Sequence, residues 1–178
     1  GYTPTGLTAY ERDFLGWRPM EEITEPGTYT LRPQGTTQGI GYKIVNDLNP
    51  DEYYILEYRA VTGNDTKLAQ YAHGLTVTHV DYNAAAWTGN RVNNDPAHQR
   101  MTLLPAAGEG IGVGWLGPND KKSVWLSDLA YVPFPGQGEV DSLTNHNPRY
   151  PAVTYTGRYM SKPVYNICED SESMTVTF

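Results

Sequence analysis

The feature that most constrains this chain is a succession of short segments in which apolar and polar residues alternate, each ended by turn residues. The clearest runs from Glu52 to Arg59 (EYYILEYR), and a period of two places alternate side chains on opposite faces of a strand. The 18 Gly, 13 Pro and 14 Tyr among 178 residues supply the turns and aromatic strand positions. This pattern predicts a mainly β chain, built as an antiparallel β-sandwich or an open barrel.

The same pattern predicts strands in other parts of the chain. They are expected at residues 28–32, 41–45, 75–82, 101–104, 112–115, 153–155, 163–167 and 173–178. No internal repeat or low-complexity linker interrupts them, so residues 1–178 are interpreted as a single β-rich domain.

The start of the chain instead predicts a short N-terminal helix. Thr8 with Glu11 three residues later forms a capping box, and Gly16 is a typical C-terminal cap. Helical spacing predicts that one apolar face is buried, formed by Leu7, Tyr10, Phe14 and Trp17.

Charge and cysteine content exclude several classes of protein. The net charge of −7 disfavours nonspecific nucleic-acid binding, which depends on Lys and Arg neutralising phosphates. No run approaches 18 apolar residues, so no transmembrane segment is predicted. Gly1 ahead of Tyr2 resembles a truncated start, and we expect that a targeting segment was removed. Cys168 is the only cysteine, which excludes an intrachain disulfide, and we predict it as a small core residue on the last strand.

Residues 73–100 (HGLTVTHVDYNAAAWTGNRVNNDPAHQR) are the stretch most suited to chemistry, because they hold three of the four histidines. His79 and Asp81 share one face of the predicted strand. Either Asp81 orients the imidazole or both side chains reach an ion, or they form a buried polar pair that fixes the following loop. Zinc bound by His73, His79 and His98 has little support from their spacing.

The loop that follows is rich in oxygen ligands. Calcium takes six to eight oxygens from carboxylates, amides and carbonyls, although the spacing is not that of an EF-hand. Asn and Asp also build turns by hydrogen-bonding their own backbone, without any metal. Both interpretations concern the same candidate residues, Asp81, Asn83, Asn90, Asn93, Asn94 and Asp95.

Other candidates are structural or lie beside a cleft. Glu57 and Arg59 share a strand face, and they form an ion pair or contact a neighbouring element, or else they are a solvated pair. Trp87 is expected to anchor the Asn/Asp-rich loop, with His98 near its end. The four tryptophans suit core or interface positions, and stacking on a sugar is the alternative.

Several stretches together resemble the immune-inhibitor-A-type secreted zinc metallopeptidases. GLTAYERDFLGW resembles the family's "LSAYD…LGW" helix, EYYILEYR its "EYFLLENR" strand, and HGLTVTHVD its "GLLIWHVD" segment. Further similar segments follow in the family's order and cover most of the chain: residues 26–31, Trp87 to Asn93 with His98, 134–136, 165–167 and 174–178. Asn64-Asp65 and residues 70–72 depart from the family's "WD…LPG" pattern.

The larger departure is the absence of H-E-x-x-H, in which two histidines bind zinc and the glutamate is general base. The resemblance therefore implies the portion downstream of the zinc helix, the C-terminal part of a longer metallopeptidase, inactive alone. Its implied partners are the upstream zinc-binding catalytic region and a protein or peptide substrate. Zinc is implied only for the parent enzyme, and the implied location is extracellular, periplasmic or at the cell surface. The alternative is a non-catalytic β-sandwich module that binds carbohydrate or protein at the cell surface.

Overall fold

A computed structural model describes residues 4–107 and 129–178. Its helical elements are α1 (Ala9–Phe14), the 3-10 turn η1 (Gly63–Asp65), α2 (Thr66–Ala69) and α3 (Ala84–Thr88). Its strands are β1 (Glu21–Glu22), β2 (Thr30–Leu31), β3 (Gly41–Asn46), β4 (Asn49–Arg59), β5 (Gly74–Asp81), β6 (Met101–Leu104), β7 (Val153–Thr154), β8 (Arg158–Tyr159), β9 (Cys168–Asp170) and β10 (Thr175–Thr177). The strand predicted at 112–115 lies outside the described residues.

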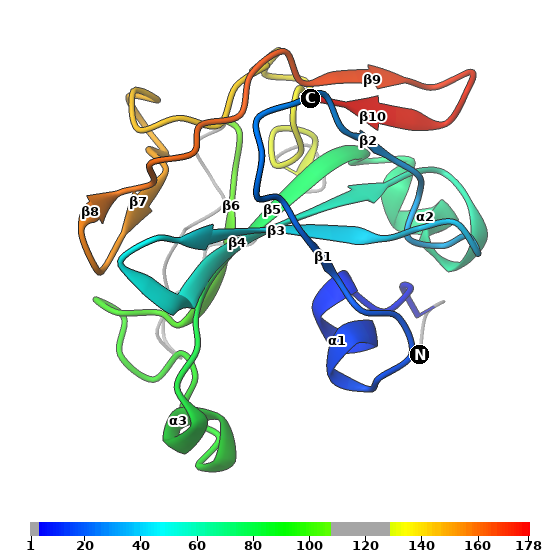
Figure 1. The fold of residues 1–178 in the computed structure, drawn as a ribbon. Helices are drawn as coiled ribbons and strands as arrows, with labels where there is room; N and C mark the ends of the chain where they lie inside the picture. The colour runs from blue at the N-terminus through cyan, green and yellow to red at the C-terminus, as the bar shows by residue number, and fades with distance from the viewer. Residues whose placement is uncertain (1–3, 108–128) are drawn as a thin grey trace, which may run out of the picture.

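The predicted fold class is confirmed, because the described residues are mainly β with a short N-terminal helix. The main sheet has the order β1-β3-β4-β5-β6 and is antiparallel except for the β1–β3 pair. A second sheet has the order β2-β10-β9, and β7 pairs with β8. The main sheet and the β2-β10-β9 sheet lie on either side of the core, and the described strands do not form a closed barrel (Figure 1).

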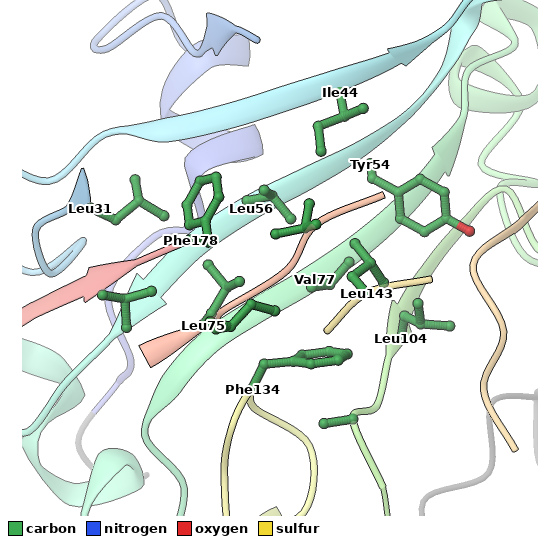
Figure 2. Packing of buried hydrophobic residues seen from close by; sticks show 14 of the residues in the cluster. Leu31, Ile44, Tyr54, Leu56, Leu75, Val77, Leu104, Phe134, Leu143 and Phe178 are labelled. Atoms are coloured by element: carbon green, nitrogen blue, oxygen red, sulfur yellow. The ribbon is translucent and has the colours of Figure 1, made fainter. Parts of the chain in front are cut away.

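The core lies between the main sheet and the β2-β10-β9 sheet. Alternation along β4 directs Tyr54, Leu56 and Tyr58 into it, as the period-two pattern predicts. Leu31 of β2 and Phe178 approach from the second sheet. Leu75 and Val77 point into the core from β5 of the main sheet, and Phe134 packs beside Leu75 (Figure 2). This apolar burial fixes the register of β4 against β5, which in turn aligns Tyr54 with His79 and Glu52 with Asp81.

Among the described residues, the opposite face of the main sheet carries a small buried cluster, Ala9, Ile55 and Val80, with α1 and α3 on that side (Figure 1). The capping box of Thr8 and Glu11 is confirmed. The predicted burial of the helix face is only partly right. Tyr10 packs against this cluster beside buried Ala9, but Phe14 is 73% and Trp17 69% exposed. A Cβ at Gly41 would lie 2.3 Å from that of Ala9, so glycine permits this close approach.

Two further predictions are corrected. Cys168 is exposed on β9 rather than buried on the last strand, since its neighbour Glu169 occupies the inward position. Residues 163–167 form only an isolated bridge between Val164 and Leu143, because Pro163 has no N–H to donate and Asn166 has φ of 56°. No helix of the described residues is long and apolar enough to cross a membrane.

Candidate functional site

A buried carboxylate organises the end of the main sheet. Glu52 is fully buried on the same face of β4 as the core tyrosines. Its Oε1 accepts hydrogen bonds from His79 Nε2 at 2.9 Å and Tyr155 N at 2.6 Å. Its Oε2 accepts from Asn46 Nδ2 at 2.9 Å and Thr156 N at 3.0 Å. Burial raises the pKa of Glu52, but these four hydrogen bonds outweigh it, and the net pKa lies below its ordinary value.

The imidazole held by this carboxylate lies inside a stack of rings. His79 is stacked between Tyr54, with centroids 4.7 Å apart, and Tyr155 at 5.3 Å. Tyr155 stacks in turn on His98 at 3.8 Å. Burial, reinforced by the carboxylates of Asp81 and Glu52, raises the pKa of Tyr155. The phenol therefore stays protonated and donates to the carbonyl of Gln99 at 3.0 Å.

Asp81 occupies the outer end of this cluster. Its partners, His98 and Arg100, were not predicted from the sequence. Its Oδ2 lies 2.6 Å from His98 Nε2 and 2.6 Å from Arg100 Nη1. No hydrogen bond joins Asp81 to His79, although both lie on one strand face as predicted. Each imidazole thus has its own carboxylate. His98 is half-buried beside the exposed ring of Tyr155, and a carboxylate-oriented imidazole in that position is suited to hydrogen-bonding a ligand or accepting a proton.

Several of the candidate calcium ligands make hydrogen bonds within their own part of the loop. Asn83 caps α3 by accepting from Ala86 N at 3.0 Å, and Asp95 accepts from Ala97 N at 2.9 Å. Asn93 exchanges two hydrogen bonds with the backbone of Met101. Asn90 follows α3 in the left-handed conformation, with φ of 50°. The contacts favour the hydrogen-bonded loop. Calcium binding stays a prediction.

Two other predicted residues also connect separate elements. Trp87 lies on α3, which the sequence analysis missed, and its ring approaches Tyr82 at 5.0 Å and Tyr10 at 6.4 Å. These ring contacts link the start of the loop to Tyr10 of α1. His73 lies just before β5 and pairs with Glu169 of β9 at 2.8 Å, away from His79.

Glu57 and Arg59 form a buried network, and the solvated alternative does not hold. Arg59 Nη2 lies 3.0 Å from Glu57 Oε1, and Nη1 lies 2.8 Å from Asp65 Oδ2. Burial lowers the pKa of Arg59, but the two carboxylates outweigh it and raise the pKa. The same carboxylates accept from Ala9 N at 2.5 Å and Gly6 N at 2.7 Å. The network therefore fastens the N-terminal segment to β4.

Sequence reasoning missed Glu52, Arg100 and Tyr155. A signal for Glu52 was present, because period two places a charged residue on the apolar face of Tyr54, and such a charge needs a buried partner. No comparable signal identifies Tyr155, which is 103 residues from Glu52. Within residues 4–107 and 129–178, no group of three or more His, Cys, Asp or Glu side chains is placed to hold a metal ion.

A groove of about 640 Å³ lies between residues 23–29 and 161–166. We call it the 23–29/161–166 groove. In Figure 1 its walls are the blue segment that joins β1 to β2 and the orange segment that leads to β9. Tyr29, Tyr165 and Phe178 line it, so its surface is largely aromatic and apolar.

No protein-family model, curated protein or solved structure matches this chain. The resemblance to the metallopeptidase family therefore rests on the quoted segments and stays a prediction.

Proposed function

We propose that the chain is the downstream, non-zinc-binding portion of a secreted zinc-dependent endopeptidase. In this proposal it completes the fold or the substrate cleft around an upstream catalytic region. That region would supply the H-E-x-x-H motif and the zinc, outside the cell, in the periplasm or at the cell surface. The chain offers no matching ligand set of its own in the described residues, so we assign it no catalytic step.

The observation that supports this proposal best is the exposed apolar surface beside α1. Phe14, Leu15 and Trp17 are exposed within four positions, next to the ring contact between Tyr10 and Trp87. Single exposed apolar residues are common, but a contiguous aromatic patch marks a surface that another element covers. It lies on the face of the main sheet that carries α1 and α3 (Figure 1), and we propose that the upstream region packs there.

The coding sequence upstream of Tyr2 gives the first test. An H-E-x-x-H motif within roughly one domain length supports the proposal. An open reading frame without it would lead us to abandon the peptidase proposal.

The second test uses the chain joined to that upstream region and measures casein hydrolysis. The double change Phe14→Ser and Trp17→Ser should lower activity because it removes the contact surface. It should leave the melting temperature of the 178-residue chain within a few degrees, since both side chains are exposed. Leu48→Ser is the matched control, because Leu48 is 70% exposed on the β3–β4 turn. Equal activity of the double variant and the control would contradict the assigned surface.

A second candidate is a non-catalytic module that binds carbohydrate or protein at a cell surface. The 23–29/161–166 groove favours it, because a concave, mostly apolar site of this volume is typical of ligand-binding sites. The two candidates differ in their dependence on the upstream region, since a binding module would retain its ligand as the 178-residue chain alone.

A further inference from the structure

A small hollow of about 250 Å³ lies beside the turn at residues 36–39. Arg32 is one of the residues that line it, and we call it the Arg32 hollow. The turn is closed by the N–H of Gly39, which donates to the C=O of Thr36 at 3.3 Å. A Cβ at Gly39 would lie 2.2 Å from the carbonyl oxygen of Pro33, so glycine is needed for the loop to fold back this tightly. These contacts fix the backbone of the turn at the edge of the hollow.

The lining of the hollow carries hydrogen-bond donors that have no acceptor among the described residues. Thr37 and Gln38 are the central residues of the turn, and both line the hollow. Within the described part of the chain, their backbone N–H groups donate no hydrogen bond, and neither does the hydroxyl of Thr37. Arg32 donates from Nη1 to the C=O of Ser173 at 2.7 Å and keeps the other N–H groups of its guanidinium. The hollow therefore favours a ligand that is rich in acceptors.

The loop that forms the turn is surrounded by arginines, although the whole chain carries a net charge of −7. Arg18 donates to the C=O of Thr37 at 2.7 Å, and Arg12 donates to the C=O of Gln34 at 2.7 Å. Across residues 4–107 and 129–178, Arg12, Arg18 and Arg32 form no ion pair with a carboxylate. Three cations around one loop favour an anion that carries more than one negative charge.

The β9–β10 turn, which reaches the hollow through Ser173, also carries Asp170 and Glu172. Asp170 Oδ1 accepts from the backbone N–H groups of Glu172 and Ser173, at 2.9 and 3.1 Å. Neither acidic residue lines the hollow, and neither forms an ion pair with Arg32. An anion in the hollow therefore meets no carboxylate among the described residues of its lining.

We propose that the Arg32 hollow binds the phosphate group of a phosphate monoester. Near neutral pH such a group carries about two negative charges and offers three strong acceptor oxygens. These match the guanidinium of Arg32 and the N–H groups of Thr37 and Gln38. Arg12 and Arg18 hold the loop in place and add positive charge. The hollow is built by this chain alone, so the inference does not depend on the proposed upstream zinc region.

An NMR titration of the isotope-labelled 178-residue chain with inorganic phosphate tests this inference. The amide signals of Thr37 and Gln38 should shift with a Kd of about 1 mM, the affinity expected from a few charge-assisted hydrogen bonds. Acetate, which carries a single charge, should bind about tenfold more weakly at the same ionic strength. Added sodium chloride should weaken the binding of phosphate, because the hollow is open to solvent and its charges are screened.

Three variants locate the binding to the hollow. Arg32→Gln should weaken phosphate binding at least about tenfold, because it removes a charge-assisted contact. Arg32→Lys keeps the charge without the planar fork and should retain part of the affinity. Arg91→Gln is the matched control and should bind phosphate as the wild type does, because Arg91 is exposed beyond α3 and outside the hollow. The melting temperature should stay within a few degrees in all three, since the replaced side chains are exposed.

Two esters distinguish the source of the phosphate group. Tighter binding of glucose-6-phosphate than of inorganic phosphate would indicate a sugar ester, and tighter binding of O-phosphoserine would indicate a phosphorylated protein. The inference is overturned if the Arg32→Gln and Arg91→Gln variants bind phosphate equally, or if acetate binds as tightly as phosphate. It is also overturned if phosphate leaves the amide signals of Thr37 and Gln38 unmoved.

Discussion

Replacing Glu52 with glutamine should destabilise the protein, although the two side chains are almost the same size. Each carboxylate oxygen accepts two hydrogen bonds, from His79 and Tyr155 on one side and Asn46 and Thr156 on the other. An amide nitrogen in either position faces two donors and loses both contacts. At about 1.5 kcal/mol each, this costs about 3 kcal/mol. If the nitrogen faces His79, a change of tautomer restores one contact and the loss is about 1.5 kcal/mol.

The effect should also depend on pH with a defined sign. The folded pKa of Glu52 lies below the unfolded value of about 4.5, since hydrogen bonds to the carboxylate outweigh burial. Its contribution to stability is therefore fully present above that value and is lost as pH falls through the folded pKa. The difference between the wild type and Glu52→Gln should be constant above about pH 5 and should shrink towards pH 2.

Urea unfolding followed by tryptophan fluorescence measures both quantities. Glu172→Gln is the matched control, because Glu172 is exposed in the turn between β9 and β10. It should change the free energy of unfolding by less than about 0.5 kcal/mol. The assigned role of the carboxylate would be refuted if Glu52→Gln lowered the free energy of unfolding by less than about 0.5 kcal/mol. It would also be refuted if the difference in free energy between wild type and variant were unchanged at pH 2.

Three other changes test separate parts of the fold. Arg59→Ala leaves Glu57 and Asp65 buried without their cation and should cost about 3 kcal/mol, with proteolysis near Gly6 becoming faster; unchanged protease resistance would contradict the fastening role. Gly74→Ala should lower the free energy of unfolding by about 2 kcal/mol, because φ at Gly74 is 129° and a Cβ would lie 2.7 Å from the carbonyl oxygen of Phe134. Gly27→Ala is the control and should be tolerated, since no atom would lie nearer than 3.5 Å to its Cβ. If the loop ligands bind calcium, EGTA should lower the melting temperature, and an identical melting curve would count against a tight site.

The sequence was informative wherever a structure depends on neighbouring residues. The Thr8 capping box and the alternation of β4 are local patterns, and both are confirmed. Helical spacing shows that Phe14 and Trp17 lie on one face, but not whether another part of the protein covers that face. Both were therefore predicted as buried, whereas both are exposed. The cap at Asn83 was readable too, but the polar loop around it concealed the five-residue α3.

The polar cluster was only half predictable for a different reason. His79 and Asp81 were identified from one strand, and their shared face followed from its period. Their partners come from elsewhere, His98 and Arg100 from the end of a loop and Tyr155 from a distant hairpin. Those contacts depend on how strands are ordered in the sheet, which no local spacing encodes.

The contacts of Glu52 also have a consequence for the order of folding. They reach 6 residues back to Asn46, 27 forward to His79, and 103 and 104 forward to Tyr155 and Thr156. During synthesis the hairpin of β3 and β4 can form early, because its loop closure is inexpensive. The carboxylate of Glu52 stays hydrated until residues 155 and 156 have left the ribosome, because their N–H groups supply two of its hydrogen bonds. We expect the charge to be removed from water only when the β7–β8 hairpin docks on the end of β4.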